Sequence, residues 1–494
     1  MIAAAALGVL LAAQSPAGHA QRSPDPGALQ QQLQQMQLRM DEIKQQLDAL
    51  DRQGQGAQAA SADTRSNAAG TTAPQPGKPA SLTWHGITLY GTVDIGVAYL
   101  THGAPLSATY PSGLPFLVQK FSNRSITSVA PNGLSQSKIG LSGVEPIIEG
   151  LSGVFKLETG FNPTSGRLSD GPASLVVNNG VPLNRQTMAS DSSRAGQAFQ
   201  GGAYAGLRST TFGTLTFGRQ NTPMADNLQK YDPQAQSLAF SPIGISGVSG
   251  GLGDTEDKTL DNTLKYTVGY GAGRAAILYQ FGSAGSIPEG GEEFDLGADV
   301  GGLSVDTLYG KIRGAVSAAA LNATQNAAAP GTLAATISDN TGYSVQASYK
   351  LKPLKLYAGY EHIEYANPAH PIAADSVDIG GYVLSTVNNT AYTHHKELQI
   401  SWTGVRYSVT PRFDLTVAYY RYDQNSYRAK HCSNTSAASC SGALNDASLV
   451  ADYRLTGRFD VYAGVDYSSV LDGMAADYLN NTDWAPMIGV RFNF

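Results

Sequence analysis

Apolar side chains alternate with small or polar ones along most of this chain, from Leu82 to the last residue. Successive side chains of a β-strand point to opposite faces, so a period of two predicts strands with one apolar and one polar face. The last eight residues place Ile488, Val490, Phe492 and Phe494 on one face and Met487, Gly489, Arg491 and Asn493 on the other. A chain that stops inside a strand favours a sheet closed on itself, because its final backbone groups then find partners.

The same alternation recurs along the chain. Apolar faces are formed by residues 87–99 at odd positions and by the sets Leu151/Phe155/Leu157/Phe161, Leu264/Tyr266/Val268/Tyr270, Phe294/Leu296/Ala298/Val300, Tyr343/Val345/Ala347/Tyr349, Phe413/Leu415/Val417/Tyr419 and Phe459/Val461/Ala463/Val465/Tyr467. The opposite faces carry Lys156, Glu158, Lys265, Asp295, Asp299, Lys350, Asp414, Asp460 and Asp466. The charges therefore collect on one side of the sheet, which we expect to be the inner side.

The connections between these strands alternate between two lengths. Short ones lie near 145–149, 209–212, 270–273, 301–302, 351–353, 410–412 and 456–458, and long polar ones near 101–134, 162–197, 221–261, 282–291, 312–340, 366–395, 423–445 and 468–483. Short turns at one end and long loops at the other are typical of outer-membrane barrels, in which lipid requires every backbone group to be paired. We therefore predict an all-β fold, a 16-stranded antiparallel transmembrane β-barrel over residues 82–494.

The composition is consistent with a barrel that has a polar interior. Only 15% of residues are charged, against roughly 25% in ordinary globular chains. The mean hydropathy of −0.18 shows no bulk apolar character, as expected when half of each strand faces water. The net charge of −6 argues against a nucleic-acid partner, which usually selects a basic surface.

The first 80 residues differ from the rest. Residues 1–20 resemble an export signal, with an apolar run and an A-x-A-like site at its end, although the missing base after Met1 suggests a truncated start. Residues 21–52 carry an a/d seam of coiled-coil spacing, formed by Leu29, Leu33, Met36, Met40, Ile43, Leu47 and Leu50. We expect a periplasmic trimeric coiled coil, or alternatively a single amphipathic helix packed on the protein. Residues 53–80 predict a flexible linker.

The chemistry-bearing residues give no sign of catalysis. Cys432 and Cys440 are the only cysteines and predict one loop disulfide in an exported protein, with two free thiols as the alternative. The adjacent His394 and His395 point to opposite sides of a strand, which disfavours a metal site. We find no nucleophile elbow, paired-cysteine zinc motif or HExxH motif, and we expect neither enzymatic activity nor a cofactor.

Several motifs together resemble the trimeric general porins of Gram-negative bacteria, in particular the β-proteobacterial type. They are Leu89-Tyr-Gly-Thr-Val-Asp94, Ser137-Lys-Ile-Gly-Leu-Ser-Gly-Val-Glu145, Val154-Phe-Lys-Leu-Glu-Thr-Gly-Phe161, Ala203-Tyr-Ala-Gly-Leu207, Phe212-Gly-Thr-Leu-Thr-Phe-Gly-Arg-Gln220 and Asn262-Thr-Leu-Lys-Tyr266. The resemblance covers residues 82–494. It implies a homotrimer whose third external loop, here about 221–261, folds into the lumen and narrows it.

The resemblance also implies roles for single residues. Asp232 matches the acid of the constriction loop, with Asp226 on the same loop, and Lys138 takes the place of a basic wall residue. Two further wall bases of the family fall on Gly201 and near Thr259, so their nearest replacements are Arg194 and Lys258. Arg219 resembles the arginine that holds the family's second external loop, which acts as a latch near the contact between subunits. Lys156 and Glu158 line the inner wall, and the terminal Phe494 resembles a signal for the assembly machinery.

These observations predict an outer-membrane porin that passes ions and small hydrophilic solutes through a gap between an acidic loop and a basic wall. The expected surroundings are outer-membrane lipid and lipopolysaccharide. One alternative is a substrate-selective trimeric channel, for example for carboxylates. Another is a structural tether or adhesin anchored by the barrel.

Overall fold

The computed structural model describes residues 82–103, 123–187, 196–245, 247–255, 258–287, 289–375, 378–428, 430–476 and 478–494. The proposed signal (1–20), coiled coil (21–52) and linker (53–80) lie outside the described residues, as does Arg194. The described ranges belong to one compact unit, Pro76–Phe494.

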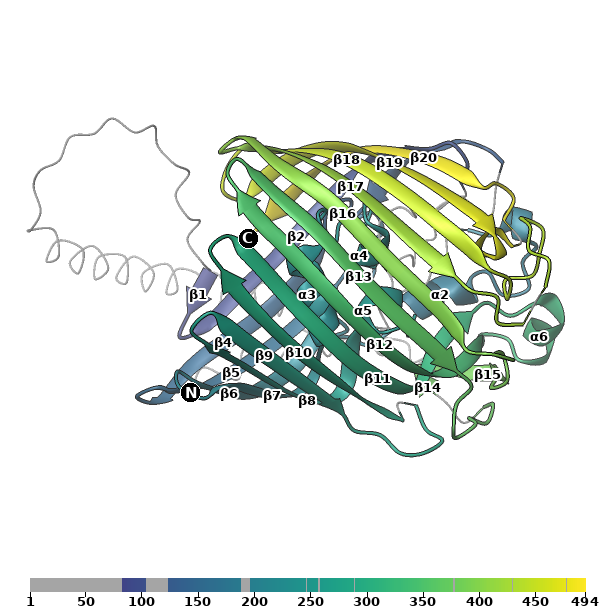
Figure 1. The fold of residues 1–494 in the computed structure, drawn as a ribbon, viewed down its shortest axis with the longest axis horizontal. Coiled ribbons are helices and arrows are strands. Elements are labelled where there is room, and N and C mark those ends of the chain that lie inside the picture. The colour runs from purple at the N-terminus through teal and green to yellow at the C-terminus, as the bar shows by residue number, and fades with distance from the viewer. Residues whose placement is uncertain are drawn as a thin grey trace, which may run out of the picture. The chain divides into compact units, whose positions relative to one another are not determined.

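In the described part of the chain, sixteen antiparallel strands close into a barrel, as the sequence predicts (Figure 1). They are β2 (Ile87–Leu100), β4 (Lys138–Ile148), β5 (Leu151–Gly160), β6 (Gly202–Ser209), β7 (Gly213–Asn221), β8 (Thr259–Tyr270), β9 (Gly273–Gln280), β10 (Gly290–Val300), β11 (Leu303–Ala319), β12 (Leu333–Leu351), β13 (Leu354–Ala366), β16 (Lys396–Thr410), β17 (Phe413–Gln424), β18 (Gly442–Arg454), β19 (Phe459–Asp472) and β20 (Thr482–Asn493). Each strand pairs with the next, and β20 pairs with β2 to close the ring.

The last residue completes the closing pair. The N–H of Phe494 donates to the carbonyl of Gly91 and the N–H of Gly91 donates to the carbonyl of Phe494, both at 3.0 Å. A Cβ on Gly91 would come within 2.3 Å of the Phe494 ring, so a glycine is needed beside the terminal aromatic side chain. The chain end is therefore paired with β2 up to its last residue.

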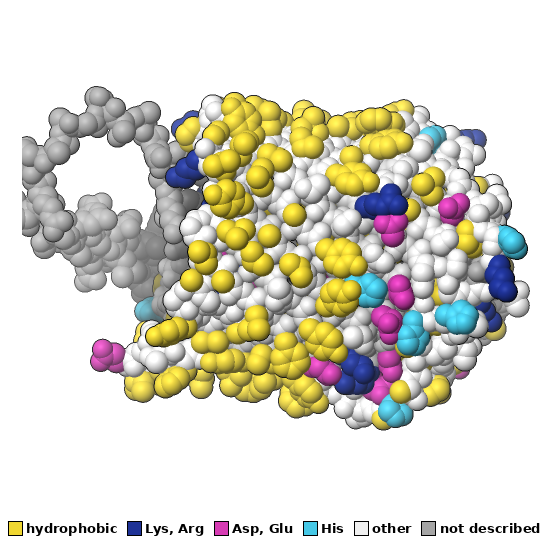
Figure 2. Space-filling model, in the orientation of Figure 1, with side chains coloured by type: hydrophobic (Ala, Val, Ile, Leu, Met, Phe, Trp, Pro, Cys, Tyr) yellow, Lys and Arg dark blue, Asp and Glu magenta, His cyan; other side chains and the backbone are white. Residues whose placement is uncertain are grey.

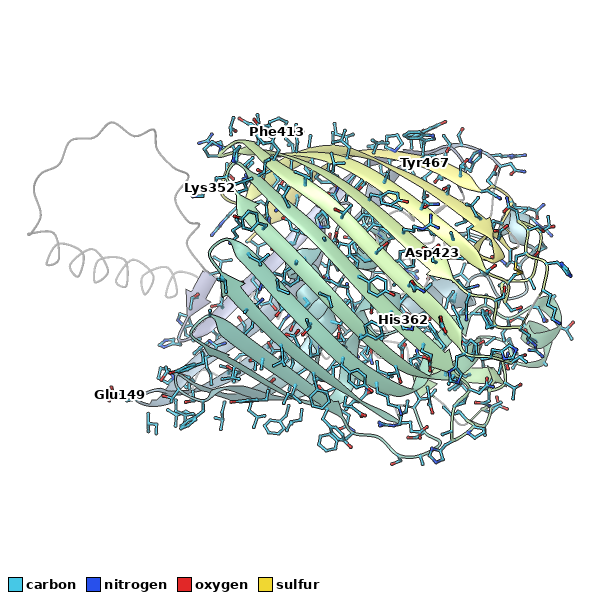
Figure 3. The ribbon with its side chains drawn as sticks, viewed as in Figure 1. Glu149, Lys352, His362, Phe413, Asp423 and Tyr467 are labelled. Atoms are coloured by element: carbon cyan, nitrogen blue, oxygen red, sulfur yellow. A yellow bond between two sulfur atoms is a disulfide. The ribbon has the colours of Figure 1, made fainter. Side chains whose placement is uncertain are left out.

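The two faces of the barrel wall follow the predicted alternation. Ile488 is 63% exposed on the outside, whereas its neighbour Met487 is 3% exposed on the inside. Figure 2 shows apolar side chains over the short-turn end and middle of the visible face, with charged and histidine side chains gathered toward the long-loop end. Lys352 and Phe413 lie at the short-turn end, as Figure 3 shows, while Asp423 lies nearer the long loops.

The short turns and long loops occur where the sequence predicts them, with one difference in length. The fifth loop was expected near 312–340, but β11 runs to Ala319 and β12 begins at Leu333. The register shifts between Ile312 and Ala315, and Gly314 adopts a φ of +68°. This β-bulge moves the side-chain alternation by one residue, which hides the continuation of the strand from a period-two reading.

Short elements decorate the loops. They are β1 (Leu82–Trp84), β3 (Ile126–Pro131), α2 (Gly171–Val176), η1 (Leu183–Arg185), α3 (Pro223–Tyr231), α4 (Pro242–Ile245), α5 (Gly247–Gly250), α6 (Ala323–Ala328), β14 (Asp378–Ile379), β15 (Tyr382–Asn388) and η2 (Gly473–Ala475). None of the helices among the described residues is long and apolar enough to cross a membrane. The predicted disulfide between Cys432 and Cys440 is confirmed, with their Cα atoms 5.5 Å apart.

Candidate functional site

Loop 3, which joins β7 to β8 over residues 222–258, packs against the inner wall of the barrel. It opens with helix α3, whose N-cap Thr222 accepts a hydrogen bond from the N–H of Ala225 and whose first residue is Pro223. Both features favour a helix start at this point. The apolar side of the helix, Met224 and Leu228, is fully buried.

The apolar side of loop 3 packs on inward-facing residues of the strands from β8 to β19. The shared core includes Met224, Leu228, Ile243, Leu252, Leu260, Leu278, Leu308, Ile312, Ile363, Ile400, Trp402, Tyr420, Tyr422, Leu444 and Val470. Trp402 also donates its indole N–H to the carbonyl of Tyr231 at 3.1 Å. The removal of this apolar area from water is the main force that holds the loop inside the barrel.

Asp232, at the end of α3, is buried at the junction of loop and wall with an exposure of 1%. Its carboxylate accepts hydrogen bonds from Tyr420 Oη on β17 at 2.5 Å and from Ser241 Oγ at 2.8 Å. It also accepts from the backbone N–H groups of Gln234 and Gln236, at 3.0 and 2.7 Å. Burial raises the pKa of Asp232 above its ordinary value, and the four hydrogen bonds offset part of this rise. The side chain therefore ties loop 3 to the wall.

Two other loop 3 charges, Asp226 and Lys230, are paired with charges on the wall. Asp226 lies 2.5 Å from Lys265 Nζ on β8, and Lys230 lies 3.4 Å from Asp306 on β11. Lys258, at the end of the loop, donates to the carbonyl of Gly244 at 3.0 Å and is 9% exposed. Asp226 and Lys230 thus each have an oppositely charged partner on the wall, whereas Lys258 is bonded within the loop.

A cavity of about 350 Å³ lies between loop 3 and the rest of the wall. Its lining from loop 3 includes Gln229, Gln234, Ala235, Gln236, Leu238 and Gly244. Lys258 lines the cavity from the end of the loop, and the barrel wall contributes the cations Lys138, Lys156, Arg406, Arg454 and Arg491 and the acids Glu158, Asp414 and Asp452. Six cationic side chains against three acidic ones leave this cavity net positive.

Apart from Lys258, the cations of the cavity form two groups. On β4 and β5, Lys138 and Lys156 share one carboxylate oxygen of Glu158, at 3.1 and 3.3 Å. Two positive charges therefore face one negative charge. Both lysines keep part of their surface open to water, 34% and 25% of the side chain.

The second group lies on β16, β18 and β20. Arg454 pairs with Asp414 at 2.9 Å and Arg491 pairs with Asp460 at 2.6 Å. Arg406 has no ion pair among the described residues; its Nη2 donates to the carbonyl of Pro233 at 3.0 Å, and its buried Nε has no hydrogen-bond partner there. The charge of Arg406 is thus uncompensated beside the cavity.

The structure brings some predicted site residues together and separates others. Lys138, Lys156, Glu158 and Lys258 line the cavity, the first three from the wall and Lys258 from the end of loop 3. Asp226 and Asp232 lie on loop 3 but do not line the cavity, and the lining face of the loop carries amides in the place of the expected acids. The acidic character predicted for this face therefore does not extend to the described residues that line the cavity.

Sequence reasoning missed the second group of cations, Arg406, Arg454 and Arg491. Each occupies an inward position of its strand, and this parity was readable from the alternation. The wall bases that the family resemblance implies lie on earlier strands, so it assigned no role to these three arginines.

Arg219, on β7, contacts the returning end of loop 2, which runs over residues 161–201. It donates to the carbonyl of Gln200 at 3.0 Å and pairs with Asp261 at 2.8 Å. Asp261 in turn accepts from the side chain of Gln197 at 3.1 Å. Among the described residues, no group of three or more His, Cys, Asp or Glu side chains is placed to hold a metal ion.

Comparisons with known proteins match the barrel. A family model described as Gram-negative porin matches residues 55–473. An outer membrane porin protein of Bordetella pertussis is 25% identical over 317 residues, which cover 61% of this chain and 71% of that protein.

Two solved structures share the fold. An anion-selective porin from Comamonas acidovorans superimposes with a TM-score of 0.54 and 17% identity, over 83% of this chain and 99% of that chain. The trimer form of OmpT, an outer membrane protein of Vibrio cholerae, gives a TM-score of 0.52 and 14% identity, over 83% and 99% of the two chains.

Proposed function

This chain belongs to the Gram-negative porin family, and on that premise we propose that it is a trimeric diffusion channel with a preference for small hydrophilic anions. The family and the closed barrel give an outer-membrane location and a channel function. The observation that carries the proposed preference is the cavity beside loop 3, where six cations and three acids line the gap.

The proposed passage runs between the amide face of loop 3 and the basic wall. A unit charge acts on an ion about 4 Å away with about 1 kcal/mol in water-like surroundings and more near a low-dielectric wall. The excess of positive charge where Lys138 and Lys156 share Glu158, together with the charge of Arg406, therefore raises the local concentration of anions. The amides of Gln229 and Gln236 offer neutral hydrogen-bonding groups to any polar solute, so selectivity by charge is graded rather than absolute.

The test is the reversal potential of the purified protein in a planar bilayer under a potassium chloride gradient. We expect its sign to report chloride preference, and a cation-selective or silent channel would contradict the proposal. A double variant, Lys138→Gln with Lys156→Gln, leaves Glu158 without its cations and should shift the reversal potential toward cations. As a control, Lys352→Gln changes a lysine in an exposed short turn and should leave the potential close to that of the wild type.

The proposed trimer contact is the outer face of β4 to β6. Its exposed side chains are aliphatic or small, such as Ile139, Leu141 and Ala205, with Gly143 between them. The outer face from β8 to β13 instead carries exposed tyrosines such as Tyr309 and Tyr343, which suit the membrane–water interface. Small side chains allow close approach of a second copy.

The seam from Leu29 to Leu50 supports a periplasmic trimeric coiled coil as a second clamp on the proposed trimer. Deletion of residues 21–52 should lower the temperature at which the trimer dissociates on a gel and leave single-channel conductance unchanged. Unchanged dissociation would assign the helix another role, such as a tether. Deletion of Phe494, the proposed assembly signal, should instead reduce the amount of inserted barrel.

A further inference from the structure

Part of loop 2 is docked on distant loops of the same barrel. We call residues 169–181 the loop 2 strap. Loop 2 leaves the rim between β5 and β6, whereas the strap contacts the β11–β12 hairpin and loop 6, which joins β13 to β16. Strands β7 to β10 lie between the two points of the rim. The strap therefore joins two non-adjacent parts of the barrel entrance.

Asn179 fixes the strap to the β11–β12 hairpin. Its side-chain oxygen accepts the N–H of Leu321 at 2.7 Å, and its side-chain nitrogen donates to the carbonyl of Thr332 at 2.6 Å. The next residue, Gly180, donates its N–H to the carbonyl of Leu321 at 2.9 Å. Asn179 is only 8% exposed, so these bonds form in a contact that excludes water.

A second contact joins the strap to loop 6. Tyr382 Oη donates to Asp170 Oδ2 at 2.9 Å, and Asp170 Oδ1 also caps helix α2 by accepting the N–H of Ala173. Leu175 and Val176 of α2 pack against an apolar cluster outside the main core, formed by Val316, Leu333, Ala335, Ile337, Ile372, Ile379 and Leu384. The strap is thus held by both polar and apolar contacts.

The base of loop 2 is equally fixed. Gln200 is fully buried; its side-chain amide accepts from the N–H of Gly160 at 2.9 Å and donates to the carbonyl of Ser169 at 3.1 Å. Gln136 donates to Ser169 Oγ at 3.0 Å. A segment secured at its base and at its far end cannot swing outward without breaking these buried bonds.

We propose that the loop 2 strap is a fixed crossbar of the outer entrance that sets the upper size of the solutes admitted, ahead of the passage beside loop 3. The side chains that dock the strap on its own barrel are occupied there, so they do not serve as a latch on a neighbouring copy. The proposal rests on the channel function, because a size limit has meaning only for a solute that passes.

The test is the swelling rate of proteoliposomes in neutral sugars, from a pentose to a tetrasaccharide. Neutral sugars remove the influence of the charged cavity. Replacing residues 171–180 by a short glycine-serine bridge should speed entry of the largest sugars several-fold and leave the pentose rate nearly unchanged. If the bridged variant does not assemble, the double substitution Asn179→Leu with Tyr382→Phe loosens the same contacts and should change the rates in the same direction by less.

The control is Ser436→Ala, which removes hydrogen bonds inside loop 7 (residues 425–441), where Ser436 Oγ accepts from the N–H of Ser433 and donates to the carbonyl of His431. It should keep the wild-type size profile. An unchanged size profile in both strap variants would overturn the proposal, as would loss of trimer heat resistance, since that would place the strap at a contact between copies. Failure of the wild type to admit even the pentose would instead refute the channel function itself.

Discussion

The two sides of loop 3 differ in how they use charge. The wall side places its charged groups in pairs or hydrogen-bond networks, such as Asp232 with Tyr420 and Lys230 with Asp306. The cavity side presents the amides Gln229 and Gln236 to a surface with an excess of cations. The acids of this loop therefore serve mainly to hold it in place, and on the proposed function the charge that acts on solutes comes from the barrel wall.

This division follows from the cost of burial. A carboxylate removed from water needs several donors, and Asp232 finds four of them at the loop–wall junction. A cation beside a water-filled cavity can remain partly hydrated and keep its field. On the proposed function, the position of loop 3 and the ion selectivity of the channel are thus set by different residues, so single mutations can separate them.

The largest expected effect comes from Asp232→Ala, on the wall side. It would leave Tyr420 Oη, Ser241 Oγ and two backbone N–H groups without their acceptor, at about 1–3 kcal/mol for each buried donor. We expect loop 3 to lose its fixed position, and single-channel recordings should show a larger and fluctuating conductance. A steady wild-type conductance would show that the apolar core of the loop holds it without this carboxylate.

Asp226→Asn is the matched control. It removes an acid from the same helix, but Asp226 is half exposed, and its partner Lys265, whose side chain is 8% exposed, also donates to the carbonyl of Asn221. The asparagine can still accept from Lys265 Nζ, so the conductance should stay steady.

The fold of the barrel could be predicted because its signals are local. Alternation within ten residues and the lengths of neighbouring connections are visible without knowledge of the tertiary structure. The exception, the fifth loop, confirms the reason: one bulge at Gly314 broke the local pattern while the sheet continued. The disulfide was likewise predictable from two cysteines eight residues apart.

The site was harder to predict, because its geometry depends on distant partners. The sequence places Asp232 on loop 3. Its carboxylate points to the wall and not to the cavity because it bonds to Tyr420, which lies 188 residues away in the sequence. The cations Arg406 and Arg454 face the lumen by strand parity, yet only the closed barrel brings them to the same cavity as Lys138. A sequence pattern gives the face of a strand and not the residue on the other side of the lumen.

Tyr420→Phe should have the next largest effect, and it isolates one bond of the wall side. It removes one donor to Asp232, and the other three donors remain. The lost hydrogen bond to a charged group contributes about 1.5–3 kcal/mol. We expect a modest increase in conductance noise and an unchanged reversal potential. A shifted reversal potential would mean that the position of loop 3 and the ion selectivity of the channel depend on the same residues, which would contradict the proposed division between the two sides of the loop.

Arg406→Gln tests the cavity side. Because Arg406 has no carboxylate partner among the described residues, its replacement removes one positive charge without leaving an unpaired acid. We expect a shift of the reversal potential toward cations with nearly unchanged thermal stability. Arg421→Gln provides the comparison, since Arg421 pairs with Asp423 outside this cavity and should not move the potential.

Gln229 allows the smallest and most specific test. It is exposed on α3 and lines the cavity, so Gln229→Glu adds the acid that the sequence led us to expect on this face. An added charge on a solvated side chain acts weakly, with about 1 kcal/mol on an ion at about 4 Å, so the expected shift of the reversal potential toward cations is small. Gln229→Lys should shift the potential by a similar amount in the opposite direction. Shifts of the same sign in both variants would mean that residue 229 acts by its size, and the passage would then not run along this face of the loop.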